Sequence, residues 1–427
     1  MGRTAAIMLT IALAAAPVSG NSTPVTMEGA MQEVLSWHPT VVQAASTLDA
    51  RGEDVTVARA GYLPRISAGV GSGYDSRLGS IWRPRPQVSA SQMLYDFGKV
   101  ASAVDFARAG TRLGRADMLL AIDGLIRETG YAIVEVQRNA ALRLIALEQL
   151  SRIQEISALV DKRFGKGATT RSDTLQAQSR VAAAQASLTR IEAEQRRWTT
   201  SLAFLLGRDT APIVDPDVPD WLMRSCRQAT QVDWADVPMI MRAKAQYEQA
   251  TAEQRRARAN RLPTVALAGD AAADISSPFS DRSIYNFGLN VSSDVFGGSA
   301  VRARVRGADY ALRAAEAAER QARVEIGQRL AEAQQQIAGL TELLGTLSER
   351  QENMIETGKL YRLQYLDMGT RTLVDLLNAE QELQQARFDG VNTTHDLRRL
   401  EIDCLYYSGR TRDDFKLTGT TIRGVTL

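Results

Sequence analysis

The sequence predicts a mainly helical chain with four β-strands, in which one structural plan is repeated in tandem and the strands belong to a membrane β-barrel. Three observations favour this fold class. All 12 prolines lie between Pro17 and Pro278, so residues 87–211 and 279–427 contain none, as long helices require. Four short segments alternate between apolar and polar residues, which is typical of strands. A set of landmark residues recurs at a nearly constant offset.

Composition excludes several broad classes for this chain of 427 residues. The charges nearly cancel, with 51 Lys and Arg against 49 Asp and Glu, whereas a dedicated nucleic-acid binder usually has a clustered basic excess. Hydrophobic residues make up 44% of the chain, which argues against wholesale disorder. Two His and two Cys cannot supply the usual four zinc ligands without carboxylates. We therefore expect no metal, no cofactor and no nucleic-acid partner.

Residues 1–20 have the pattern of a cleavable signal peptide. Arg3 precedes the apolar run Ala5–Ala16, and small residues lead to a cleavage site near Gly20. This run is too short for a membrane-spanning helix, which needs about 20 apolar residues. The alternative is an uncleaved N-terminal helix. No later run is long enough either, so the exported chain is expected to be soluble or to enter a membrane as β-strands.

The second feature of the sequence is an internal duplication. Landmarks of the first half recur 199 residues later near its start and 202 residues later near its end. The matching pairs are His38-Pro39 and Val237-Pro238, Leu63-Pro64 and Leu262-Pro263, Phe97-Gly98 and Phe296-Gly297, Gly167 and Gly369, Asp173 and Asp375, Leu175 and Leu377, and Gly207 and Gly409. We expect a first repeat over 21–211, an inter-repeat segment over 212–232, a second repeat over 233–409 and a C-terminal tail over 410–427.

Each repeat is expected to open with a helix, at about 31–62 and 233–261, which the Leu-Pro pair ends. Two strands should follow in each repeat, at about 64–74 and 86–96 in the first and 263–273 and 284–295 in the second. The period of two leaves one apolar face and one small or polar face, as in membrane β-barrels. The alternative is a pair of ordinary hairpins on a soluble domain.

Four strands are too few to close a barrel, because the smallest membrane barrels have about eight. An open sheet in lipid would leave backbone groups unpaired at its edges, each costing several kcal/mol. Strands in a membrane therefore require oligomerisation, and three copies would supply twelve strands.

The proline-free stretches predict long helices. The first should run from about Lys99 to Phe164, roughly 100 Å at 1.5 Å per residue, and return as a helix from about Ser172 to Leu206. The second repeat should do the same, with a break around Met368-Gly369-Thr370 and a return to about Tyr407. Apolar residues within 142–160 and 337–354 have the heptad-like spacing of coiled coils. The opening and return helices together are about as long as the long helix. Their ends should therefore meet halfway along it, at a level that we call the waist, beside residues 212–238 and the tail.

This layout resembles the TolC family of outer-membrane efflux and secretion channels over the whole mature chain. The resemblance rests on the duplication and on the strand–helix junctions Leu94-Tyr95-Asp96-Phe97-Gly98 and Val295-Phe296-Gly297-Gly298. Its most specific part is the segment Gly369-Thr370-Arg371-Thr372-Leu373-Val374-Asp375-Leu376-Leu377-Asn378-Ala379, which is similar to the family's periplasmic-tip motif.

The resemblance implies a homotrimer in the outer membrane of a Gram-negative bacterium. Its twelve-stranded β-barrel would lie in outer-membrane lipid, and a long α-helical barrel would extend into the periplasm. Such a duct is passive and docks onto a periplasmic adaptor protein and an inner-membrane ABC or proton-driven transporter. The exported substrate, a protein or a small molecule, stays open, because the same duct serves both.

By resemblance, the tip also carries the gate. Arg371 is expected to bond to Ser172 and Asp173 of the neighbouring protomer, and Asp375 to project towards the axis, where three like charges raise one another's pKa. Asn378 stands where the family can have a second acidic residue. The family's tyrosine position, three residues before the glycine, is Leu366 here, with Tyr365 beside it. Gly165, Gly167 and Gly369 form the tip turns. The alternative role of Asp173 and Asp375 is capping of the return helices.

Cys226 and Cys404 both map to the expected waist, where an oxidising compartment permits a disulfide; two buried thiols are the alternative. A soluble exported coiled-coil adhesin or scaffold shares the helices of this prediction but not the four alternating segments. A periplasmic adaptor would show a lipoyl-like β-domain between its helices, and an enzyme is disfavoured because no nucleophile–base constellation is present. The basic run Arg255-Arg256-Ala257-Arg258 is expected to be a solvated helix face rather than a nucleic-acid patch.

Overall fold

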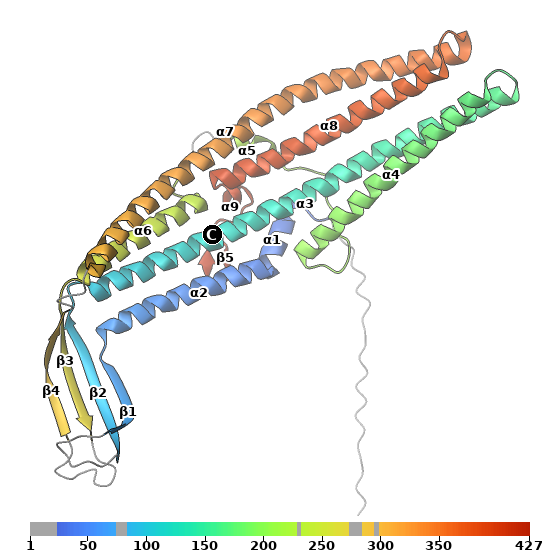
Figure 1. Cartoon of the computed structure of the whole chain (residues 1–427). Coiled ribbons are helices and arrows are strands. Elements are labelled where there is room, and N and C mark those ends of the chain that lie inside the picture. The colour runs from blue at the N-terminus through green and yellow to red at the C-terminus, as the bar shows by residue number, and fades with distance from the viewer. Residues whose placement is uncertain (1–23, 74–82, 229–231, 273–283, 294–298) are drawn as a thin grey trace, which may run out of the picture.

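The structure is a computed structural model that describes residues 24–73, 83–228, 232–272, 284–293 and 299–427. The molecule is elongated, with a sheet at one end and two helical hairpin turns at the other (Figure 1). The expected signal peptide and the junction Val295-Phe296-Gly297-Gly298 lie outside the described residues. No helix in the described part of the chain combines the length and the apolar character needed to cross a bilayer.

The first repeat opens with two helices, and the expectation of a single helix from residue 31 was wrong. Helix α1 runs over Met27–Trp37 and α2 over Pro39–Arg59, with a break at His38. Thr26 caps α1 by accepting a hydrogen bond from the Gly29 N–H at 3.1 Å. Pro39 has no N–H to donate to α1 but fits the first position of a new helix, so the chain turns there.

The other elements of the first repeat lie close to their predicted bounds. They are β1 (Arg65–Gly73), β2 (Arg83–Tyr95), α3 (Lys99–Gly165) and α4 (Arg171–Leu206). Helix α3 begins where the Asp96 carboxylate accepts hydrogen bonds from the Gly98 and Val100 N–H groups, at 2.9 Å and 2.6 Å. A carboxylate at this end of a helix satisfies free N–H groups and complements the helix dipole.

The second repeat has α6 (Pro238–Ala259), β3 (Thr264–Ala272), β4 (Ile284–Ser292), α7 (Ala300–Leu363) and α8 (Leu373–Ser408). Two differences from the predicted bounds stand out. Helix α6 starts at Pro238 rather than at residue 233, again because proline suits a first helical position. Helix α7 ends in a π-helical turn, η3 (Gln364–Met368), which sequence periodicity does not indicate.

The largest hydrophobic core lies at mid-length of α3, where α1, the inter-repeat segment and the C-terminal tail pack together (Figure 1). The tail forms α9 (Thr411–Asp414) and the short strands β5 (Thr421–Ile422) and β6 (Val425–Thr426). Its Phe415 side chain is fully buried and stacks edge-on against Trp221, with ring centroids 4.9 Å apart. Burying a phenylalanine contributes about 1.5–3 kcal/mol, so the tail is an integral part of this waist.

A disulfide joins Cys226 and Cys404 at the waist. It links the short helix α5 (Ser225–Gln228) to α8, with Cα atoms 5.1 Å apart and a sequence separation of 178 residues. The adjacent Glu401 carboxylate accepts hydrogen bonds from the Cys226 N–H at 2.7 Å and from the Ser225 hydroxyl at 2.6 Å. Closing so long a loop is expected to stabilise the fold by about 2–4 kcal/mol.

Candidate functional site

The four strands form one antiparallel sheet in the order β1-β2-β3-β4. Residues that pair directly across strands share a face, and the register aligns Ile66 with Ala90, Ala90 with Gly269 and Gly269 with Phe287. Every second residue along each strand therefore belongs to this same face. Apart from Ser72 and Gln92, its members are apolar or glycine and include Ile66, Ala68, Val70, Val88, Ala90, Val265, Leu267, Gly269, Ala271, Tyr285, Phe287, Leu289 and Val291.

This apolar face is not covered by any described part of the chain. Phe287 is 83% exposed, Tyr285 78% and Ile66 70%. Soluble monomers rarely expose contiguous apolar patches of this kind, and alternation of apolar-out with polar-in is the pattern of strands that line a lipid-embedded wall.

The opposite face of the sheet is polar and partly hydrogen-bonded. The Ser67 and Ser89 hydroxyls lie 2.7 Å apart, and the Asn286 amide donates to the Asp270 carboxylate at 2.7 Å. Arg65 and Arg85 pair across strands with Ser91 and Gly71 on this same face. The sheet therefore has one polar face and one apolar face.

The far end of the molecule carries two hairpin turns of similar construction. In the first, Gly165 ends α3, and Gly167 adopts the left-handed conformation, with a φ of 71°. Thr170 caps α4, since its hydroxyl accepts from the Asp173 N–H at 3.3 Å while Asp173 accepts from the Thr170 N–H at 3.1 Å. Ser172 lies beside this cap, with its hydroxyl 2.7 Å from that of Thr170. This reciprocal capping box fixes where the return helix begins.

The second turn repeats these features. Gly369 has a φ of 62°, and Thr372 and Asp375 form the same reciprocal capping box at the start of α8. The Thr372 N–H and hydroxyl donate to Asp375 at 3.1 Å and 2.9 Å. Thus the structure gives both aspartates the capping role that the sequence left open.

Hydrogen bonds at these caps lower the pKa of both aspartates. For Asp173 the donors are the Thr169 hydroxyl and the Thr170 N–H and hydroxyl; for Asp375 they are the Thr372 N–H and hydroxyl. The predicted rise in the pKa of Asp375 would come from repulsion among three copies around an axis. Within one chain, the hydrogen bonds of the cap lower this pKa instead. Both groups are therefore charged at neutral pH in the single chain.

Tyr365 links the two hairpins at the tip. It lies in η3 and is buried, with the Arg163 guanidinium 4.9 Å from its ring centroid, and its carbonyl accepts from Arg163 at 3.2 Å. Burial raises the pKa of its hydroxyl; Arg163 opposes this rise, and the nearby Asp173 carboxylate adds to it. Because a π-helical turn holds one extra residue, it turns Tyr365, rather than Leu366, into this buried position.

Arg371 lies on the exposed side of the second turn and does not contact Ser172 or Asp173 of its own chain. Its guanidinium covers the Tyr361 ring at 4.5 Å and donates to the Gln364 side chain at 3.2 Å. Asn378 accepts a hydrogen bond from Arg180 of α4 at 3.2 Å, so it ties α8 to α4. No local sequence motif marks Arg163, Arg180 or Gln364, so their contacts at the tip were not predicted.

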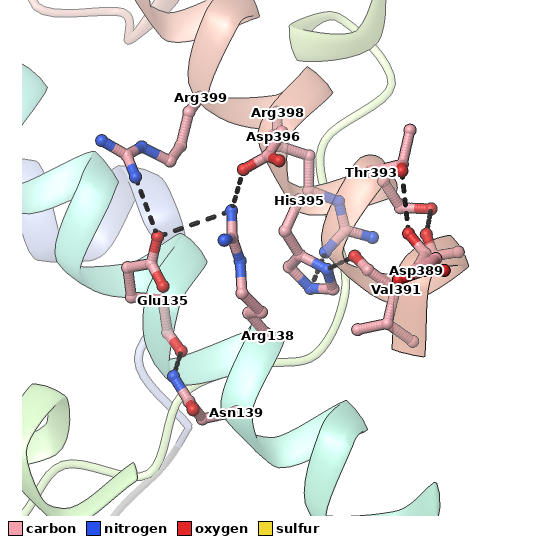
Figure 2. A network of polar contacts seen from close by, with 12 residues as sticks. Glu135, Arg138, Asn139, Asp389, Val391, Thr393, His395, Asp396, Arg398 and Arg399 are labelled. Atoms are coloured by element: carbon pink, nitrogen blue, oxygen red, sulfur yellow. Dashed lines mark hydrogen bonds and ion pairs between the residues drawn. The ribbon is translucent and has the colours of Figure 1, made fainter. Parts of the chain in front are cut away.

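A polar network fastens α8 to α3 between the tip and the waist (Figure 2). Arg138 pairs with Asp396 at 2.5 Å, and Glu135 accepts from Arg399 at 3.1 Å. His395 accepts a hydrogen bond from Arg398 at 3.0 Å, and burial lowers its pKa to about 4. His395 is thus neutral at physiological pH.

Comparisons with known proteins agree with this geometry. A family model described as outer membrane efflux protein matches residues 30–208 and 235–403. The sequence is 26% identical over 326 residues to protein CyaE of Bordetella pertussis, which covers 71% of this chain and 67% of that protein.

The fold is also similar to that of solved structures. The outer-membrane channel OprN superposes with a TM-score of 0.77 at 23% identity, covering 90% of this chain and 89% of that chain. The outer membrane protein VceC from Vibrio cholerae superposes with a TM-score of 0.79 at 18% identity, covering 90% and 96%. At these identities the likeness shows a shared fold.

Proposed function

Because the chain belongs to the outer membrane efflux protein family, we propose that it is the passive exit duct of a tripartite export system. Three copies would share one wall, with twelve strands closed in the outer membrane of a Gram-negative bacterium and the helices extending as a tube into the periplasm. A periplasmic adaptor and an inner-membrane ABC or proton-driven transporter would supply substrate and energy.

The observation that supports this proposal most directly is the exposure of one apolar face and two strand edges of the sheet. Its exposed apolar face suits lipid, and in the described chain β1 and β4 each pair on one side only. Unpaired strand edges in lipid cost several kcal/mol for each backbone group, whereas pairing β1 of one copy with β4 of the next removes all edges. The polar face would then line the bore. A coiled-coil scaffold explains the helices but leaves this apolar face unexplained.

The gate assignment is part of the proposal. Arg371 lies at the exposed surface of the tip, and in the proposed trimer its guanidinium would contact the Ser172 and Asp173 side chains of a neighbouring copy. Asp375 would face the axis, and Asn378, held by Arg180, would contribute no charge there. An exposed ion pair contributes only about 0–1 kcal/mol, so a docking partner could open such a gate. Whether a protein or a small molecule passes is set by the partners.

Reconstitution of the purified protein into a planar bilayer tests the proposed function. We expect discrete current steps of uniform size, because each inserted trimer would add one water-filled bore. Inserted protein that carries no current, either as the wild type or with Arg371 replaced by Ala to weaken the proposed gate, would contradict the proposal of a duct. As a matched control, protein unfolded before addition should give no steps.

A further inference from the structure

We propose that the strand-proximal ends of α6 and α7 form a binding surface for anionic phospholipid headgroups. We call this surface the basic collar and define it as Arg261, Arg302, Arg304 and Arg306. The inference rests on the proposed function, because it requires the adjoining strands to lie in a membrane. The collar would then face the periplasmic leaflet.

The collar lies where the helices meet the sheet. Arg261 precedes the first residue of β3, Thr264, by three positions, and the other three arginines lie in the first two turns of α7. At 1.5 Å per residue these three span only about 6 Å of the helix axis. Figure 1 shows the ends of α6 and α7 together beside β3 and β4. If the strands lie in a bilayer, a position beside their ends corresponds to the headgroup layer.

The collar arginines have no acidic partner in the described part of the chain. Nearby acids are already taken by other arginines, in the ion pairs Arg255–Asp105 at 3.1 Å, Arg256–Glu253 at 3.1 Å and Arg258–Asp309 at 3.0 Å. All four collar side chains are exposed, and none forms an ion pair with a described residue. The basic run Arg255-Arg256-Ala257-Arg258, predicted to be a solvated helix face, is thus neutralised by acidic residues of the same chain, whereas the collar is not.

Within the chain, the positive charges on α7 are energetically unfavourable. Arg302 and Arg306 are four residues apart on one helix face, where like charges repel. They also lie at the N-terminal end of the helix, which favours negative charge, and the first turn of α7 contains no acid. In α3, the corresponding long helix of the first repeat, the first eight residues contain Lys99 and Asp105. The repeated fold therefore does not require a cluster of arginines at this position. No acid in the described part of the chain offsets these charges, so the collar is available to an anionic partner.

The surroundings of the collar favour a lipid surface as that partner. Leu262, next to Arg261, is 43% exposed, and the exposed apolar face of β3 and β4 begins immediately beyond it. At the corresponding junction of the first repeat, Tyr95 and Phe97 are exposed and pack edge-to-face at 4.6 Å. Aromatic and basic side chains gather where a membrane protein crosses the headgroup layer, and arginines there attract anionic lipids.

The test uses full-length protein reconstituted in phosphatidylcholine bilayers that contain a minority of phosphatidylglycerol. Protein is extracted with mild detergent, and mass spectrometry gives the ratio of the two lipids it retains, relative to the parent bilayer. For the wild type we expect roughly a twofold or larger enrichment of phosphatidylglycerol. High salt during reconstitution should remove the enrichment, because it screens exposed charges.

The variant R302Q/R304Q/R306Q should retain the two lipids at the bulk ratio. The matched control R190Q/R196Q/R350Q, which removes three exposed arginines without a described ion pair on α4 and α7, should keep the enrichment. Undiminished enrichment in the collar variant would overturn the inference. Wild-type protein that inserts but retains both lipids at the bulk ratio would also overturn it and leave the duct intact, whereas protein that fails to insert into any bilayer would contradict the proposed function itself.

Discussion

Leu289→Arg is expected to abolish the outer-membrane trimer, whereas Asn290→Arg should leave it intact. The two residues are neighbours in β4, but Leu289 lies on the exposed apolar face and Asn290 on the polar face. An arginine that faces lipid near the bilayer centre costs about 2–4 kcal/mol, and a trimer would incur this cost three times. An arginine that faces a water-filled bore costs far less.

The measurement is the amount of trimer that resists dissociation in the outer-membrane fraction of cells expressing each variant. Asn290→Arg is the matched control, since it adds the same side chain one residue away on the same strand. Equal trimer levels in the two variants would show that the apolar face does not meet lipid, and the assignment of the strands to a membrane would fail.

Arg371→Ala is expected to increase the conductance of the reconstituted duct several-fold while leaving the amount of trimer unchanged. The proposed gate depends on contacts between Arg371 and the Ser172–Asp173 pair of the neighbouring copy. Each exposed contact contributes up to about 1 kcal/mol, so three symmetric contacts can shift the balance between closed and open states by a large factor. Single-channel recording in a planar bilayer measures this change directly.

Two substitutions of Asp173 are needed to separate its proposed gate contact from its capping role, because its carboxylate also caps α4. Asp173→Asn removes the charge but keeps an oxygen that can accept from the Thr170 N–H, whereas Asp173→Ala removes both. We expect raised conductance in both variants and a loss of thermal stability in Asp173→Ala alone. Lys359→Ala is the control, since its ion pair with Glu356 lies within α7. Wild-type conductance in Arg371→Ala and in both Asp173 variants would refute the gate assignment.

Backbone chemistry explains which parts of the fold the sequence predicts well. Proline and glycine limit where helices start and end, so the bounds of α3 and α4 follow almost to the residue from Phe97-Gly98, Gly167 and Gly207. Alternation predicts the strands because only a period of two places Ile66, Ala68 and Val70 together on one face. The break at His38 was not predicted, although Pro39 marks it, because proline ends one helix but also suits the first position of the next.

The interactions at the tip could not be predicted to the same depth. The π-helical turn η3 accompanies the packing between hairpins in which Tyr365 is buried against Arg163, and no periodicity in one helix encodes it. The bond between Arg180 and Asn378 joins residues 198 positions apart, so neither residue has a local signal. By contrast, the capping boxes of Asp173 and Asp375 depend on residues three positions away and are readable as local motifs.

The central claim is that one chain supplies too little sheet to close a wall, so that copies must join around a bore. The most direct measurement is an image of the detergent-purified complex viewed along its long axis, together with its mass. We expect the mass of three chains and a central opening with threefold symmetry. A particle with the mass of one chain, or a three-chain particle with no opening through its β-stranded end, would contradict the claim.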